Sequence, residues 1–303
     1  MPAIQTHELS KRYGDVTAVD RVDLTVEEGE IFGFLGHNGA GKSTVINMLL
    51  DFARPTEGQV EVFGMDCREH SVDVRERMGV LPEGYDVYDR LTGRQHLQFA
   101  AESKGVEIEP MSIAERVGIR DAVDRRAGDY SKGMAQRLVL GMALIGDPDL
   151  LILDEPTSGL DPGGARRMRE IIHEENERGA TVFFSSHILE QIEAVCDRVG
   201  IMHEGRLQAV DTIDALRESA AGGTKLQISV DDPSETHLDT IEAVDGVDSA
   251  WIEDETFAVT CPSDVKMDVL VALDAAGVDV LDFSTEEPSL EDLFVEYTRE
   301  GGQ

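Results

Sequence analysis

The most constraining feature of this sequence is a glycine-rich stretch between two apolar segments. The stretch follows the apolar run 30–35 and reads Gly36-His37-Asn38-Gly39-Ala40-Gly41-Lys42-Ser43-Thr44. An apolar run of this length predicts a buried strand, and the pattern from Val45 to Leu50 predicts a helix behind the glycines. A strand, a glycine-rich loop and a helix in this order are typical of a loop that holds nucleotide phosphates. The sequence therefore predicts an α/β domain with a nucleotide site.

The chemistry of this loop explains the residue types in it. Glycines let backbone N–H groups turn toward the phosphates, and the helix N-terminus adds about half a positive charge. Lys42 would bring a mobile positive charge to the β and γ phosphates, and Ser43 would place a hydroxyl on Mg²⁺. We expect ATP and Mg²⁺ as cofactors. The remaining ATP contacts are expected at Gly36, Asn38, Gly39, Ala40, Gly41 and Thr44.

A second apolar run, Leu150–Leu153, ends in two neighbouring acids, Asp154 and Glu155. Ligands bind at the carboxyl ends of strands in sheets of this class, so both acids are expected beside the phosphate loop. Asp154 would hold the Mg²⁺ shell, and Glu155 would orient and polarise the attacking water. An acidic turn that merely ends a strand is the alternative in so acidic a chain.

A third segment has the sequence Tyr130-Ser131-Lys132-Gly133-Met134-Ala135-Gln136-Arg137. Ser131 and Gly133 stand at the start of a predicted helix, where a hydroxyl and a free N–H group form an anion site. A plain helix cap is the alternative for this segment taken alone.

In this order, the three segments resemble the ATP-binding subunits of ABC transporters. The third is a relaxed form of the family's signature motif, with Ser131-Lys132-Gly133-Met134 in place of Ser-Gly-Gly-Gln. The resemblance implies that Ser131 and Gly133 bind the γ-phosphate held by a partner subunit. It further implies that Tyr13 stacks on adenine, that the loop 158–161 links the two active sites, and that His187 contacts the γ-phosphate. The expected catalytic residues are thus Lys42, Glu155 and His187.

One position departs from the usual pattern of the family. Glu83 stands where most members have a glutamine that senses Mg²⁺ and the transport domain. The same substitution appears in a branch that resembles drug exporters and ABC-2-type exporters, so the resemblance implies a metal and coupling role for Glu83. An ordinary turn acid is the alternative. The segments 36–38, 81–83 and 130–134 also resemble the ATPases of copper-maturation exporters.

The order of predicted elements indicates two domains. The expected ATP-binding domain covers 1–220 and combines a mostly parallel sheet, an antiparallel β subdomain and a helical subdomain at about 84–140. Short apolar runs predict strands of the β subdomain at 4–9, 16–19 and 22–26, and the run 181–184 predicts a further buried strand. Gly105 and Pro110 are expected to break the helices of the insertion. The small-residue stretch 220–223 suggests a boundary. An accessory domain over 224–303 follows, where the order β-α-β-β-α-β predicts a small α+β ferredoxin-like fold with a closing helix over 290–297.

Composition limits the partners of the chain. It has 61 acidic and 27 basic residues, for a net charge of −34. The acids are spread along the chain, as in Glu27-Glu28 and Glu174-Glu175, which predicts an acidic surface adapted to molar salt. Such a chain is repelled by nucleic acid and by anionic membrane surfaces. The composition resembles that of proteins from salt-loving archaea, and we expect a halophilic protein. No segment reads as a signal peptide or approaches the ~20 apolar residues that span a bilayer, so we expect a soluble cytoplasmic chain.

Together these observations predict the ATP-hydrolysing subunit of an ABC exporter. Its expected partners are a second ATPase copy and a separate polytopic permease. The chain would dimerise around ATP, as a homodimer or heterodimer, and lie at the inner face of the membrane through the permease. The alternative is a soluble ABC ATPase that acts on nucleic acid or ribosomes. That class would predict tandem cassettes, a long coiled-coil insertion or basic patches, and the sequence has none of these.

Overall fold

In the computed structural model, the chain separates after Thr212 into two units, Met1–Thr212 and Ile213–Gln303. The structure describes residues 1–219, 224–231, 233–253, 256–262 and 264–286. The division falls before the expected small-residue stretch at 220–223, because α8 (Ile213–Ser219) groups with the second unit.

A six-stranded sheet forms the centre of the first unit. Its order is β10-β9-β3-β8-β7-β6, parallel except for the β9–β10 pair. Every residue of β3, β7 and β8 is buried, which is why these strands appear in the sequence as continuous apolar runs. The strands are β3 (Ile31–Leu35), β6 (Met78–Leu81), β7 (Leu150–Asp154), β8 (Thr181–Ser186), β9 (Arg198–His203) and β10 (Arg206–Thr212).

A second, antiparallel sheet has the order β2-β1-β4-β5. Two separate strands were expected at 16–19 and 22–26, but β2 runs unbroken because a bulge at Arg21, with a φ of 48°, keeps it paired with β1. The strands are β1 (Pro2–Tyr13), β2 (Val16–Glu27), β4 (Glu57–Val62) and β5 (Met65–Asp66).

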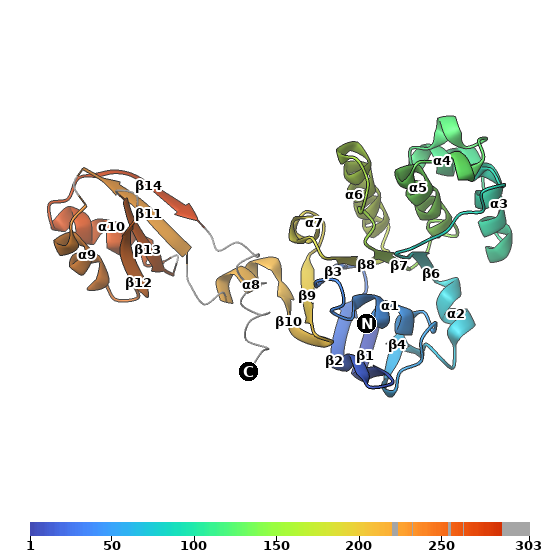
Figure 1. Cartoon of the computed structure of the whole chain (residues 1–303), viewed down its shortest axis with the longest axis horizontal. Coiled ribbons are helices and arrows are strands. Elements are labelled where there is room, and N and C mark those ends of the chain that lie inside the picture. The colour runs from blue at the N-terminus through green and yellow to red at the C-terminus, as the bar shows by residue number, and fades with distance from the viewer. Residues whose placement is uncertain (220–223, 232, 254–255, 263, 287–303) are drawn as a thin grey trace. The chain divides into compact units, whose positions relative to one another are not determined.

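Helices cover both faces of the six-stranded sheet (Figure 1). On one face, α1 (Lys42–Leu49) contacts β2, β4 and β7 and so lies between the two sheets. It begins three residues before the expected start at Val45, directly after Gly41. On the other face, α5 contacts β6, and α6 and α7 contact β8. These helices are α5 (Lys132–Ala143), α6 (Pro162–Glu177) and α7 (Leu189–Glu193).

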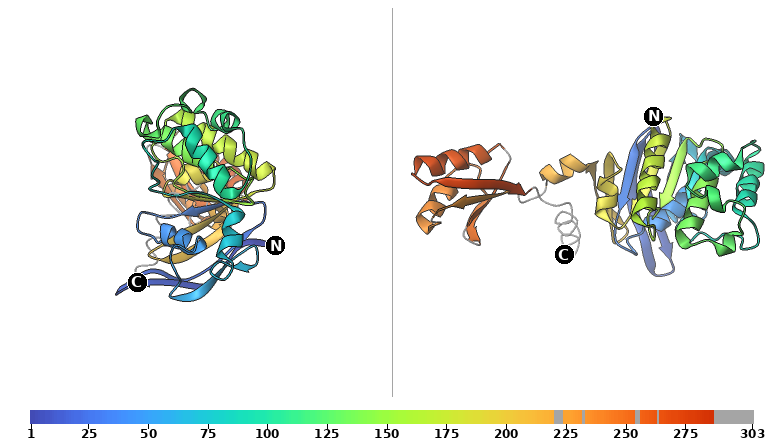
Figure 2. Two further views of the ribbon diagram at one scale, coloured as in Figure 1. Left: turned by 90° about the vertical axis from the view of Figure 1, so that its right-hand side faces the viewer. Right: turned by 90° about the horizontal axis from the view of Figure 1, so that it is seen from above.

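The expected helical insertion is confirmed, with its breaks at Gly105 and Pro110. Here α3 (Gly93–Lys104) and α4 (Pro110–Arg116) pack against α5, and two short 3-10 turns follow at Arg120–Ala122 and Ala127–Asp129. The left view in Figure 2 shows these green helices at the top and the strands of the blue antiparallel sheet below. The short α2 (Ser71–Glu76) contacts β6.

The buried core joins the two sheets of the first unit. Phe32 and Phe183 stack with ring centroids 5.8 Å apart, and Phe34 contacts Phe183 at 5.1 Å. All three lie on β3 and β8, next to the phosphate loop, so the core fixes the strand ends that carry the polar residues of the site.

One acidic residue of the first unit is buried instead of lying at the surface. Glu175 was expected on an acidic surface, but its side chain is fully buried in α6, between Arg116 of α4 and Arg178. Burial raises the pKa of Glu175, and the two arginines oppose that shift. The two cations explain why a carboxylate is tolerated there.

The second unit contains a four-stranded antiparallel sheet in the order β12-β13-β11-β14. The predicted β-α-β-β-α-β order is confirmed, and α9 and α10 pack together on a core that includes Ile228, Phe257 and Leu273. The expected closing helix at 290–297 lies outside the described residues. The elements are β11 (Thr224–Val230), α9 (Glu235–Glu242), β12 (Ser249–Glu253), β13 (Thr256–Cys261), α10 (Lys266–Ala275) and β14 (Val280–Glu286).

Among the residues described in the two units, no helix combines the length and the apolar composition needed to cross a membrane.

Candidate functional site

The glycine-rich loop leads from β3 into α1, and its shape requires glycine at two positions. A Cβ atom on Gly36 would lie 2.6 Å from the carbonyl oxygen of Met202. Gly41 has a φ of 108°, and a Cβ atom there would lie 2.6 Å from the carbonyl oxygen of Ala18. The Gly205 N–H also donates to the Ala40 carbonyl at 2.9 Å. Neighbouring backbone thus holds the loop in the conformation that leads into the helix N-terminus.

The Lys42 side chain folds back across this loop. Its Nζ donates to the Gly36 carbonyl at 2.5 Å and lies 3.7 Å from Oε1 of Glu155. Both side chains are buried, with 6% of Lys42 and 7% of Glu155 exposed. A buried ammonium group bound to only a few oxygen atoms has donors left for phosphate oxygens.

Asp154 ends β7, and two hydroxyl groups converge on it. Ser185, on the neighbouring β8, donates to Oδ1 of Asp154 at 2.5 Å, and Ser43 from the start of α1 also makes a side-chain hydrogen bond to it. Burial raises the pKa of Asp154, and the two serines partly oppose this shift. Hard oxygen donors and a buried carboxylate that lacks a full counter-charge fit a Mg²⁺ ion.

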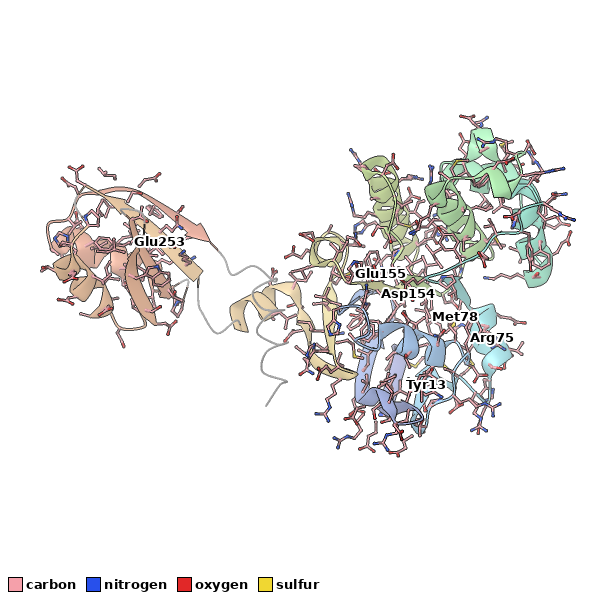
Figure 3. The ribbon with its side chains drawn as sticks, viewed as in Figure 1. Tyr13, Arg75, Met78, Asp154, Glu155 and Glu253 are labelled. Carbon is pink, nitrogen blue, oxygen red and sulfur yellow. The ribbon has the colours of Figure 1, made fainter. Side chains whose placement is uncertain are left out.

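Glu155 follows Asp154 in an unusual backbone conformation. Its φ is 50°, in the left-handed region that non-glycine residues rarely adopt, and its N–H donates to the Ser185 carbonyl at 3.1 Å. In this conformation, Oε1 of Glu155 lies 2.9 Å from Nδ1 of His187, the residue after β8. The structure therefore joins Lys42, Glu155 and His187 through one carboxylate oxygen. Figure 3 shows Asp154 and Glu155 side by side at the strand end.

Ser131 and Gly133 lie elsewhere, at the start of α5. Ser131 is exposed and caps the helix by accepting the Met134 N–H at 3.3 Å. Gly133 lies against the loop 158–161, since a Cβ atom there would be 3.2 Å from Leu160. An exposed serine at a helix N-terminus is open to an anion brought by another chain.

Glu83 and Tyr13 come from different sheets of the first unit. Glu83 follows β6 and lines a cavity of about 540 Å³ together with Asp154, Glu155 and Lys132. Tyr13 ends β1 on the antiparallel sheet (Figure 3). Tyr13 is 51% exposed, and the Lys11 ammonium lies 4.8 Å from the centroid of its ring.

Sequence reasoning missed two residues of the site. Ser185 could have been found, because it is a polar residue near the end of a buried strand beside β7. Gln136 lies inside the third motif, but the motif alone does not predict a role for it. Only the structure shows that its amide donates to the backbone carbonyls of Glu155 and Pro156, just after Asp154.

Comparison with known families agrees with this geometry. Residues 19–158 match the model described as ABC transporter, and residues 212–298 match the model described as ATP-binding protein DrrA1-3-like, C-terminal domain.

Individual proteins show the same likeness. The chain is 38% identical to the bacitracin transport ATP-binding protein BcrA of Bacillus licheniformis over 295 residues, which covers 96% of each chain. It is 41% identical to the fluoroquinolones export ATP-binding protein of Mycobacterium tuberculosis, covering 71% of this chain and 72% of that one. A solved ATP-binding subunit of an ABC transporter is 30% identical, with a TM-score of 0.66, over 71% of this chain and 92% of that one.

Proposed function

This chain belongs to the family of ABC transporter ATP-binding proteins, and on that premise we propose that two copies enclose ATP to drive a separate membrane permease. It is the ATP-hydrolysing subunit of an ABC exporter. In the proposed dimer, the phosphate loop with Lys42 in one copy faces the Ser131–Gly133 helix of the other. The observation that carries the proposed ATP hydrolysis is that Lys42 and His187 both approach the same carboxylate oxygen of Glu155.

The residues at the strand ends suit the binding of Mg–ATP. Ser43 and Asp154 would hold Mg²⁺, which neutralises charge on the phosphates when bound. Glu83 would offer an oxygen from the facing loop. Backbone N–H groups from Gly36 to Thr44 would bind the phosphates, and the exposed Tyr13 ring would stack on adenine.

Glu155 is placed to handle the attacking water. Its carboxylate would accept a hydrogen bond from that water and orient it toward the γ-phosphate. His187 contacts Oε1 of Glu155, and the Lys42 ammonium approaches the same oxygen. When ATP binds, the Lys42 ammonium would turn to the phosphates. The Glu155 carboxylate would then keep its contact with His187 and accept a hydrogen bond from the water.

Dimer formation and transport follow from the same contacts. ATP that touches both copies stabilises the closed pair, and loss of the γ-phosphate removes those contacts. One chain carries both halves of the site, so a homodimer is sufficient. We propose that the permease docks near Glu83 on the helical subdomain, which would hold the chain at the cytoplasmic face of the membrane.

The relatives favour a drug-type cargo. Proteins similar to this chain over most of its length are named for bacitracin transport and for linearmycin resistance. We therefore propose export of amphiphilic antibiotics by an ABC-2-type permease. A copper-maturation exporter is the alternative, and it rests on the three short segments at 36–38, 81–83 and 130–134.

The test is the Glu155→Gln variant in the full chain. We expect hydrolysis to fall by about 10²–10³-fold while ATP still binds, so that light scattering finds a stable dimer with ATP and a monomer without it. Glu177→Gln, an exposed change on α6, is the matched control. Wild-type hydrolysis by Glu155→Gln would remove Glu155 from its role, and a chain that stays monomeric with ATP would contradict the proposed dimer.

A further inference from the structure

Gln136 connects α5 with the backbone that carries the proposed catalytic acid of the same chain. Its side chain is buried, and its Nε2 donates to the Pro156 carbonyl at 2.6 Å and to the Glu155 carbonyl at 3.4 Å. Gln136 lies one turn beyond Ser131 on the helix that would complete the partner's site. A single amide group thus reaches from that helix to the end of β7.

The Gln136 amide contacts a backbone segment whose conformation is intrinsically unfavourable. Glu155 has a φ of 50°, and a non-glycine residue keeps such a conformation only where its surroundings hold it. The Glu155 carbonyl accepts the Ser158 N–H at 3.1 Å, and its own N–H donates to the Ser185 carbonyl at 3.1 Å. Gln136 supplies the part of this support that comes from outside the sheet and its following turn. The resulting backbone geometry directs the Glu155 carboxylate toward His187.

The other half of the amide group shows that Gln136 is not simply a satisfied polar residue of the core. Its Oε1 is buried and has no hydrogen-bond partner among the described residues. Leaving a buried acceptor unpaired destabilises a fold, so packing alone does not explain a glutamine here. Only the donor end is used, and donors are what the carbonyls of Glu155 and Pro156 require.

A second contact ties the same helix to the loop that carries Glu83. The Tyr85 hydroxyl donates to the Lys132 carbonyl, in the first turn of α5, at 3.0 Å. Tyr85, Lys132 and Gln136 all line the cavity of about 540 Å³ beside Glu155. The position of α5 is therefore linked both to the loop where we place the permease contact and to the backbone of the catalytic acid.

We propose that Gln136 is a positioning residue that holds Glu155 in its left-handed conformation, so that hydrolysis by one subunit depends on where that subunit's own α5 lies. This inference rests on the catalytic role proposed for Glu155. If α5 moves away, the amide leaves both carbonyls, and Glu155 is free to turn its carboxylate from the site. The helix would then serve two active sites: the partner's through Ser131, and its own through Gln136.

The experiment uses the full chain with Gln136→Met, which keeps the volume of the side chain and removes the donor. We expect kcat to fall by about 10- to 100-fold, with KM within about twofold of wild type and binding of a fluorescent ATP analogue unchanged. Gln95→Ala is the matched control, because it removes a glutamine that caps α3 in the same subdomain without touching Glu155. Gln136→Asn, too short to reach the carbonyls, replaces Gln136→Met if that variant does not fold.

A double-mutant comparison separates positioning from a general structural role. In a Glu155→Ala background, Gln136→Met should leave the residual single-turnover rate unchanged, because the side chain it positions is absent. A further 10- to 100-fold loss in that background, or a wild-type kcat for Gln136→Met alone, would overturn the inference. If Glu155→Ala itself hydrolysed ATP normally, the proposed role of Glu155 would be the part that fails.

Discussion

The Nδ1 atom of His187 lies 2.9 Å from Oε1 of Glu155. The two residues are 32 positions apart in the chain, but each follows one of the neighbouring parallel strands β7 and β8. Parallel pairing brings these strand ends to one edge of the sheet, where the acid and the imidazole meet. Since Lys42 approaches the same oxygen at 3.7 Å, the three residues form one group whose members can be tested separately.

His187→Ala should slow hydrolysis with little effect on ATP binding. The substitution removes the partner that orients the Glu155 carboxylate, and we expect kcat to fall by about 10²-fold. Steady-state ATPase assays with a separate titration of a fluorescent ATP analogue would distinguish the two effects. His173→Ala, an exposed histidine on α6, is the control. An unchanged kcat in His187→Ala would show that Glu155 needs no imidazole.

Lys42→Ala should weaken the binding of the phosphates themselves. A charged hydrogen bond of about 1.5–3 kcal/mol is lost, so the Kd for ATP should rise by about 10- to 100-fold. Calorimetry would measure ATP and AMP in parallel, since AMP lacks the β and γ phosphates and should bind equally to both proteins. Equal ATP affinity in wild type and variant would place the lysine outside the phosphate site. Lys266→Ala, in the second unit, controls for the loss of one positive charge.

Asp154→Asn should change how stability depends on pH in the nucleotide-free protein. Burial raises the folded-state pKa of Asp154, so the folded chain holds this proton more tightly than the unfolded chain does. The contribution of the Asp154 proton to the free energy of unfolding is complete below the unfolded-state pKa of about 4. This contribution is lost as pH rises through the raised folded-state pKa of Asp154. Wild type should therefore lose stability relative to Asp154→Asn across that window, as urea unfolding at a series of pH values would show. A difference that stays constant with pH would contradict this.

The same variant should also lose Mg²⁺-dependent hydrolysis, because an amide is a weaker ligand than a carboxylate for a hard cation. If Asp154→Asn is more stable than wild type without Mg–ATP but has lost activity, the Asp154 carboxylate is needed for function although it destabilises the folded chain. Retained Mg²⁺-dependent hydrolysis would exclude it from the metal site.

Concentrated salt should stabilise the protein. The net charge of −34 opposes compaction, and acids such as Glu27, Glu28 and Asp231 are exposed. Raising KCl from 0.1 M to 1 M shortens the Debye length from about 10 Å to about 3 Å. We expect at least about 1 kcal/mol of stabilisation, or a rise in Tm of about 2–4 °C. A Tm that does not change with KCl would show that the acidic surface needs no screening.

Much of the fold could be predicted because it depends on local pattern. The apolar runs at 150–153 and 181–184 identified buried parallel strands, and the breaks at Gly105 and Pro110 identified two helices of the insertion. Errors arose where tertiary pairing overrides local pattern. Pairing with β1 keeps β2 continuous through its bulge at Arg21. Ion pairs with Arg178 and with Arg116, which is distant in sequence, allow Glu175 to be buried.

The sequence alone was enough to propose Lys42 for the phosphates, Ser43 and Asp154 for Mg²⁺, and Glu155 for the attacking water, because these residues stand in short segments that predict a strand, a loop and a helix. The contacts between these segments could be seen only in the folded chain. The contacts of Glu155 with His187 and with the Gln136 amide depend on a left-handed backbone and on the packing of a helix distant in sequence. Such contacts are set by the packing of whole elements, and residue spacing along the chain carries no record of them.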